Sequence, residues 1–177
     1  MHGRDNLVIR RMAALLVDTA LVGAYTALLA GGVAAVSFTP VEGLLRRFLS
    51  VPASGETVQL FLLTAPAMGY FGVAESLAPG ATVGKALFGI RVVGSTGGRL
   101  PVARALERSM WKVLPWELGH LVLWRINSGD GLGEREVMGA YLAIYALLGS
   151  YVASAVATGG RSSLYDWLSA SRVEPVL

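Results

Sequence analysis

The run Met12–Val36 is 25 residues long and contains one charged side chain, Asp18. A helix of this length can cross the hydrocarbon core of a bilayer, which takes about 20 residues at the helical rise. A carboxylate inside such a span costs on the order of 3 kcal/mol by insertion scales, so it needs a partner, a proton or an aqueous cavity. The run therefore predicts a membrane-spanning helix in which Asp18 faces other helices or water rather than lipid.

The composition agrees with a single membrane domain over residues 1–177. Hydrophobic residues make up 54% and charged residues 15% of the chain, whereas soluble domains have about 45–50% and about 25%. No cysteine is present, which excludes disulfides and thiolate metal sites.

The first apolar run is longer than the roughly 7–15 residues of a signal-peptide core, so we expect it to be retained. The net charge of +3 is explained by membrane loops, so we expect a lipid bilayer as partner and no nucleic acid.

Four apolar segments predict an all-α membrane protein built as a four-helix transmembrane bundle. The expected spans are about 12–36, 58–78, 104–126 and 137–158. The third is the weakest, because its uncharged part, Val113–Trp124, is too short to cross alone. A helix from Arg104 to Ile126 has the required length, and Arg104, Arg108 and Lys112 would then lie at one membrane surface. A re-entrant or interfacial placement is the alternative.

The distribution of basic residues predicts the orientation. If the N-terminus lies in the cytoplasm, four crossings place eleven Lys and Arg residues inside and four outside. This bias is what the positive-inside rule expects. We therefore predict a multi-pass protein of the plasma (cytoplasmic) membrane with both termini in the cytoplasm.

Short elements are expected between and after the spans. Thr82 is the predicted N-cap of a short helix over Val83–Phe88. Ile90–Val93 and Arg99–Val102 flank a glycine-rich turn, a pattern that predicts a small cytoplasmic hairpin. The extended tail, Ser171–Val176, could pair with that hairpin.

Two amphipathic stretches are expected at the membrane surfaces. Val41–Ser50 is predicted to lie at the outer surface. In the tail, Ser163 and Asp166 form a loose capping pair. The apolar stripe that follows suits an amphipathic tail lying on the membrane; it comprises Leu164, Trp167 and Leu168.

Three blocks of the chain form a set of motifs, namely Arg11–Asp18, Thr82–Val93 and Leu164–Val173. Together and in this order they resemble the RDD family of bacterial integral membrane proteins. The second block is similar to the family segment T-x-G-K-x-x-x-G-x-R-V-V. The third is similar to the family ending L-H-D-x-x-A-G-T-x-V, although Tyr165 stands where histidine is common and Ala170-Ser171 where Gly-Thr is usual. The departure at Tyr165 argues against histidine chemistry at that position.

This resemblance implies a multi-span membrane domain, and ion or solute transport is suggested for some members. The family-motif residues in this chain are Arg11, Asp18, Gly84, Lys85 and Asp166.

Asp18 has two interpretations. It is either a cation or proton site that faces the bundle interior, or a buried anchor hydrogen-bonded to a neighbouring helix. Glu75 could join Asp18 in a polar cluster or reach interfacial water. Arg11 lies at the cytoplasmic end of the first span, and a contact with Asp166 would tie the tail to that helix.

Glu117 and His120 are three residues apart and therefore neighbours on one helix. Glu-x-x-His is half of the ligand set of di-iron bundles, but the chain has one such motif, so we expect no metal and no other cofactor. The remaining alternatives are a proton relay through His120 or a hydrogen-bonded Glu117–His120 pair. No G-x-S-x-G elbow is present, and we do not expect an enzyme.

The leading functional hypothesis is cation or proton-coupled solute transport, with a monovalent cation as the expected ligand. Asp18 is the first site candidate, followed by Glu117, His120 and Glu75. Four helices leave little room for a channel within one chain, so transport is expected to require a homo-oligomer. The alternative is an accessory or scaffold subunit of a larger membrane partner, without transport of its own. A small-residue face over Gly149, Ala153 and Ala157 allows another helix to approach closely, within this chain or across a dimer, and we expect it to serve internal packing.

Overall fold

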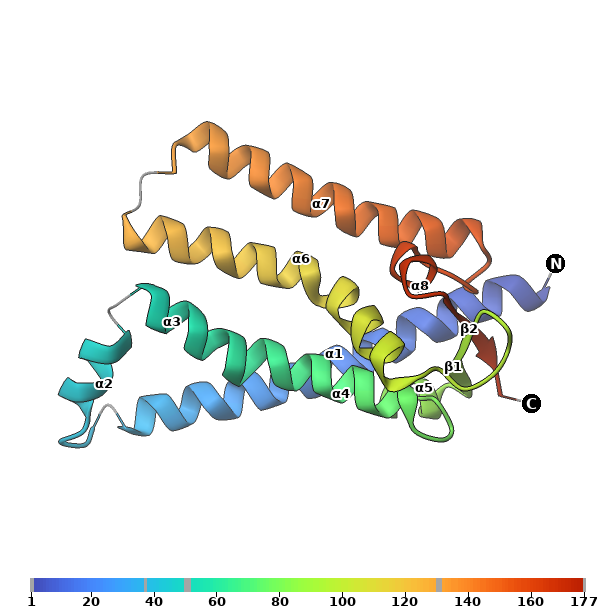
Figure 1. The fold of residues 1–177 in the computed structure, drawn as a ribbon, viewed down its shortest axis with the longest axis horizontal. Helices are drawn as coiled ribbons and strands as arrows, with labels where there is room; N and C mark the ends of the chain where they lie inside the picture. Colours follow the sequence, from blue (N-terminus) through green and yellow to red (C-terminus); the bar gives the residue numbers. More distant parts are fainter. Residues whose placement is uncertain (1, 37, 50–51, 130–131, 177) are drawn as a thin grey trace.

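Four long helical rods lie side by side in the computed structural model, which describes residues 2–36, 38–49, 52–129 and 132–176 (Figure 1). The second rod is continuous but changes from α-helix to a π-helical turn and back. The rods are α1 (His2–Val36), α3 (Pro52–Gln59) with the π turn η1 (Leu60–Thr64) and α4 (Ala65–Ser76), α6 (Val102–Ser128), and α7 (Glu134–Ala157).

Three of the rods contain stretches that are long and apolar enough to cross a membrane. These stretches are Leu7–Val36, Gly55–Ser76 and Glu134–Ala157, in agreement with three of the four predicted spans. The remaining rod, α6, is 27 residues long and packs against both α4 and α7. It carries more charge than the other three, so its length and composition alone do not establish a crossing.

The π turn is explained by a proline. Pro66 lacks the N–H that would donate to the carbonyl of Leu62 in a regular helix. The hydroxyl of Tyr25 on α1 donates to that carbonyl at 2.8 Å. The irregular backbone of the second rod is thereby tied to α1 within the membrane-spanning part of the protein, where an unpaired carbonyl would be costly.

The short elements gather at two ends of the bundle (Figure 1). The amphipathic helix α2 (Glu42–Leu49) lies at one end, within the predicted stretch 41–50, of which Ser50 falls outside the described residues. The other end carries the remaining small elements, and we call it the sheet end. Its elements are α5 (Val83–Leu87), β1 (Ile90–Gly94), α8 (Leu164–Leu168) and β2 (Ser171–Pro175).

The predicted hairpin is wrong in its second strand. β1 pairs antiparallel with β2, with Val92 opposite Val173, so the tail supplies the partner strand. The segment after the glycine turn forms no strand because Pro101 has no N–H for a ladder and instead precedes the first residue of α6. The pairing of the tail with residues 90–93 is as predicted.

The buried apolar core lies at the sheet end. Leu7, Ile90, Leu100 and Val173 belong to it, and all are at most 6% exposed. Away from this end, apolar side chains of α1 and α7 face outward, such as Leu28 at 77% exposure. This distribution is unfavourable in water and is expected for helices covered by lipid.

The small-residue face of α7 is one of these outward surfaces. Gly149, Ala153 and Ala157 are exposed, and a methyl group added at Gly149 would meet no atom within 4 Å. The prediction that this face packs internally is therefore wrong. The side of α7 that carries Ile144 and Tyr151 is the buried one.

Candidate functional site

Asp18 is fully buried and accepts hydrogen bonds from three groups of its own chain. The hydroxyls of Thr82 and Tyr70 donate at 2.6 and 2.7 Å, and the backbone N–H of Gly84 donates at 2.9 Å. Two of these donors belong to the first turn of α5, where unpaired N–H groups favour a carboxylate. Asp18 therefore anchors the start of α5 on α1, and its contacts fit the anchor interpretation.

The other end of α5 is held by a second side chain of α1. The guanidinium of Arg10 donates from Nε to the carbonyl of Phe88 at 2.6 Å and from Nη2 to that of Gly89 at 3.2 Å. Asp18 meets the start of α5 and Arg10 its end, so α1 and α5 run antiparallel. The negative charge of Asp18 thus lies at the N-terminal end of the α5 dipole and the positive charge of Arg10 at the C-terminal end, where each is favourable.

Gly84 makes the close approach of α5 to α1 possible. A Cβ atom at this position would overlap the carbonyl oxygen of Ala14 and would lie 2.9 Å from Oδ1 of Asp18. A side chain would push the two helices apart, so a glycine is needed here. The family-motif glycine thus has a packing role.

Five charged side chains at the sheet end form a chain of alternating sign that we call the charge network. Lys85 donates to Oε1 of Glu75 at 2.7 Å, and Arg108 binds the other oxygen of Glu75. Arg108 also reaches Oδ1 of Asp166 at 2.6 Å, and Arg11 binds Oδ2. All five side chains are at most 8% exposed.

The charge network closes on α1. Nζ of Lys85 lies 3.4 Å from the hydroxyl of Thr82, which in turn donates to Asp18. Arg11, at the other end of the network, is seven residues from Asp18 on the same helix. The predicted contact between Arg11 and Asp166 is confirmed, and the ring of contacts holds α4, α5, α6 and α8 against α1.

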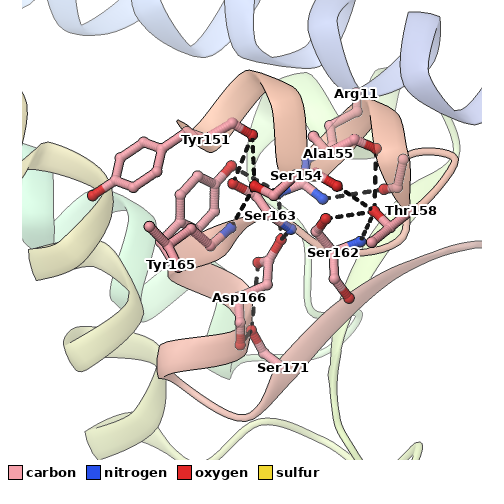
Figure 2. Close-up of polar contacts among 12 residues, drawn as sticks. Arg11, Tyr151, Ser154, Ala155, Thr158, Ser162, Ser163, Tyr165, Asp166 and Ser171 are labelled. Atoms are coloured by element: carbon pink, nitrogen blue, oxygen red, sulfur yellow. Dashed lines mark hydrogen bonds and ion pairs between the residues drawn. The ribbon is translucent and has the colours of Figure 1, made fainter. Parts of the chain in front are cut away.

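The C-terminal part of α7 positions Asp166 (Figure 2). The hydroxyl of Ser154 on α7 accepts from the N–H of Leu164 at 2.9 Å, and the hydroxyl of Ser163 donates to the carbonyl of Tyr151 at 3.1 Å. Asp166 then accepts from the N–H of Ser163 at 2.7 Å, so the predicted capping pair is present.

Asp166 is the network carboxylate that lies after the last span. Burial alone would raise its pKa, but the adjacent charges of Arg108 and Arg11 outweigh burial and hold the pKa below its ordinary value. The ring of Tyr165 lies 5.0 and 5.4 Å from these two guanidinium groups. Asp166 is therefore held as a carboxylate between two cations and an aromatic ring.

A second polar cluster lies farther along α6, at Glu117. The hydroxyl of Thr64 donates to its Oε2 at 2.5 Å, and Nε2 of Gln59 lies 3.3 Å from the same oxygen. Gln59 and Thr64 are five residues apart, and the π turn between them brings residues at this spacing to one side of the helix. Both are buried, whereas Glu117 is half-buried.

Glu117 differs from the network carboxylates in its charge partners. Among the residues that the structure describes, no Lys, Arg or His forms an ion pair with Glu117. Its negative charge meets two neutral donors, both at one oxygen. Such an arrangement leaves room for a proton or a cation at this carboxylate.

The predicted pair of Glu117 with His120 is not formed. Nδ1 of His120 lies 3.0 Å from the carbonyl of Trp116, one turn earlier on α6, and the two rings are in contact at a tilt of 52° with centroids 4.6 Å apart. His120 and Trp116 line an apolar crevice of about 360 Å³ between α6 and α7. Glu117 instead turns to α3 and η1, where Gln59 and Thr64 offer the donors that a carboxylate needs.

Arg108 is the network residue that sequence reasoning misplaced. The sequence predicts it at the membrane surface, yet it is 1% exposed and joins Glu75 to Asp166. The signal that could have located it is charge balance, because two buried acids require cations within reach. No cluster of three or more metal-ligating His, Cys, Asp or Glu side chains occurs within the described ranges.

These features define a polytopic membrane protein whose short helices are fastened to the first span by a buried charge network. A family model, the RDD family, matches residues 7–170. The chain therefore belongs to the RDD family, and the five motif residues expected from the resemblance all lie in the ring of contacts around α5. No curated protein and no solved structure matches the chain.

Proposed function

We propose that this RDD-family protein moves a proton or a monovalent cation, coupled to a solute, across the cell membrane, with Glu117 as the ion-binding group. The observation that supports this proposal is that Glu117 lacks a cationic partner within the described residues while two neutral donors hold one of its oxygens. The oxygens of Asp18 and Glu75 are already engaged by strong donors of the chain.

The proposed route follows the interface between the second rod and α6. Ionisable groups occur along it from end to end: Glu75 with Arg108 at the sheet end, Glu117 farther along, and Glu56 with Arg125 at 3.7 Å toward the other end. The proposal takes α6 as a fourth crossing, with the basic sheet end and both termini in the cytoplasm.

The proposal also requires a homo-oligomer. Much of α1 beyond Asp18 is exposed, and methyl groups at Gly23 and Gly31 would meet no atom within 4 Å. Such small-residue surfaces allow close approach of another helix in a membrane. A second copy on this face would supply further helices to line a path that four helices alone cannot enclose.

The test is ion flux in vesicles reconstituted with purified protein. Glu117→Gln keeps the size of the side chain but removes its charge, so we expect flux of protons or of Na⁺ or K⁺ to fall to the protein-free background. Glu107→Gln is the matched control, because Glu107 forms a partly exposed pair with Arg104 on the same helix, and it should retain flux. Wild-type flux at background, or full flux in Glu117→Gln, would contradict the proposal.

The accessory-subunit function is supported by the same open face of α1. In that case the face is covered by a different membrane protein, and the chain itself moves no ion. Purification in mild detergent separates the alternatives: a stoichiometric partner that is lost in Gly31→Leu favours the accessory role. A homo-oligomer that is lost in the same variant favours transport.

A further inference from the structure

We infer that the ligand of Glu117 is the proton itself and not a metal cation. This inference rests on the proposed function, because it specifies what the ion-binding group binds. It follows from two observations. Gln59 and Thr64 direct hydrogens at Oε2 of the carboxylate, and they leave Oε1 without a hydrogen bond among the described residues.

The hydrogen-bond directions in the cluster are fixed by counting protons. Thr64 has one hydroxyl proton, which it donates to Oε2 of Glu117 at 2.5 Å. The group of Gln59 that lies 3.1 Å from the hydroxyl oxygen of Thr64 must therefore be its donor, the amide NH₂. The same NH₂ lies 3.3 Å from Oε2 of Glu117.

This arrangement disfavours a metal ion. A bound Na⁺ or K⁺ needs several oxygen lone pairs directed at one point, and carboxylate, hydroxyl and carbonyl oxygens supply them. In the cluster, the hydroxyl of Thr64 and the NH₂ of Gln59 direct their hydrogens toward Glu117. A metal ion at Oε2 would meet the positive ends of both dipoles, so both side chains would have to reorient.

A proton fits without any rearrangement. Within the part of the chain that the structure describes, no hydrogen bond reaches Oε1 of Glu117. A proton needs only this one oxygen, whereas Na⁺ or K⁺ at Oε1 would need further oxygen ligands, and Thr64 and Gln59 direct hydrogens rather than lone pairs toward Glu117. Protonation at Oε1 gives a neutral carboxyl whose Oε2 still accepts from Thr64 and Gln59. The two donors thus hold the side chain in one position in both protonation states.

The other ionisable groups near this interface are engaged elsewhere. On α6, Nζ of Lys112 lies 3.3 Å from the centre of the Phe71 ring, and His120 bonds to Trp116. At the start of the second rod, Glu56 pairs with Arg125. The helices around Glu117 therefore offer it neutral donors and no charged partner within the described residues. Binding of a proton is then the event that changes the charge of this side chain.

The experiment is infrared difference spectroscopy of the reconstituted full-length protein between acidic and alkaline pH, in choline buffer free of metal cations. We expect a carbonyl-stretch band of a protonated carboxyl group that is missing in Glu117→Gln and present in Glu107→Gln. Thr64→Val removes one donor while keeping Glu117, so it should shift this band to higher frequency. This second variant keeps the test decisive if Glu117→Gln folds poorly.

Two results would overturn the inference. The first is a spectrum in which no pH-dependent carboxyl band depends on Glu117 or Thr64. The second is a carboxylate band that shifts when NaCl or KCl is added at constant pH and that is lost in Glu117→Gln. Spectroscopy needs no transport, so the Glu117 band in a protein without flux would contradict the proposed function alone. Na⁺ flux without that band would contradict this inference alone.

Discussion

The charge network at the sheet end and the Glu117 cluster farther along α6 both remove carboxylates from water, but they surround them differently. Glu75 and Asp166 each contact two cations, and no oxygen of either acid is left without a strong donor. Glu117 has two neutral donors on one oxygen. A saturated acid has little to gain from a further ligand, whereas an unsaturated acid in a low-dielectric site favours one.

The residues that carry the family motif and the residue that we propose to bind an ion are therefore different ones. The motif residues Arg11, Asp18 and Asp166 hold α5 and α8 against α1 through contacts that are complete within the chain. Glu117 lies outside the three blocks that carry the family resemblance. We therefore expect changes in the network to reduce stability, and changes at Glu117 to alter function with little loss of stability.

The largest loss of stability is expected from Arg108→Met. The substitution leaves Glu75 and Asp166 buried with one cation each, and removal of one partner from such a buried pair costs about 3–5 kcal/mol. The free energy of unfolding can be measured by SDS titration in mixed micelles. Arg91→Met is the control, because Arg91 is 42% exposed where it pairs with Glu174, and such pairs contribute at most about 1 kcal/mol. Equal effects of the two substitutions would show that burial does not distinguish these pairs.

Gly84→Ala is expected to be next in size. The added methyl group overlaps the carbonyl oxygen of Ala14, and overpacking of this kind costs about 1–3 kcal/mol. The same unfolding measurement applies. Gly98→Ala, at a glycine with no atom within 4 Å of the added methyl, should change the unfolding free energy much less. An unchanged stability in Gly84→Ala would mean that α5 does not lie directly on α1.

Asp18→Asn should cost about 1–2 kcal/mol. The amide keeps one acceptor oxygen but places an NH₂ group where the carboxylate accepted from Thr82 or from Tyr70 and Gly84, and a mismatched buried donor carries a penalty of this order. Unfolding of the purified variant measures the loss. A stability equal to that of the wild type would show that Asp18 is not an anchor.

The smallest expected effect is a dependence of stability on pH at Asp166. Because the folded-state pKa of Asp166 lies below its ordinary value, its stabilising contribution is complete above the unfolded pKa of about 3.9 and is lost as pH falls through the folded pKa. The difference in unfolding free energy between wild type and Asp166→Asn should stay constant from pH 7 to about pH 4 and shrink in more acidic solution. A difference that already shrinks between pH 7 and pH 5 would contradict the lowered pKa.

The sequence predicted the parts of this molecule that depend on local rules and on charge pairing. The apolar runs, the short helix after Thr82 and the contact between Arg11 and Asp166 follow from helix length, capping and the need of a buried acid for a cation. The partner strand of β1 did not follow, because it comes from the tail and is selected by tertiary geometry. Likewise, the direction in which Glu117 points depends on the π turn before Pro66, which periodicity does not reveal.

Proton flux per folded molecule is the most direct test of the different roles of Asp18 and Glu117. It is measured side by side for Asp18→Asn and Glu117→Gln in vesicles of the same lipid, with folded protein quantified by size-exclusion chromatography. We expect Asp18→Asn to yield less folded protein but to retain flux per folded molecule within about twofold of the wild type. Glu117→Gln should yield as much folded protein as the wild type and no flux above background. The reverse pattern, in which folded Asp18→Asn is inactive and Glu117→Gln is fully active, would contradict the assignment of the two carboxylates.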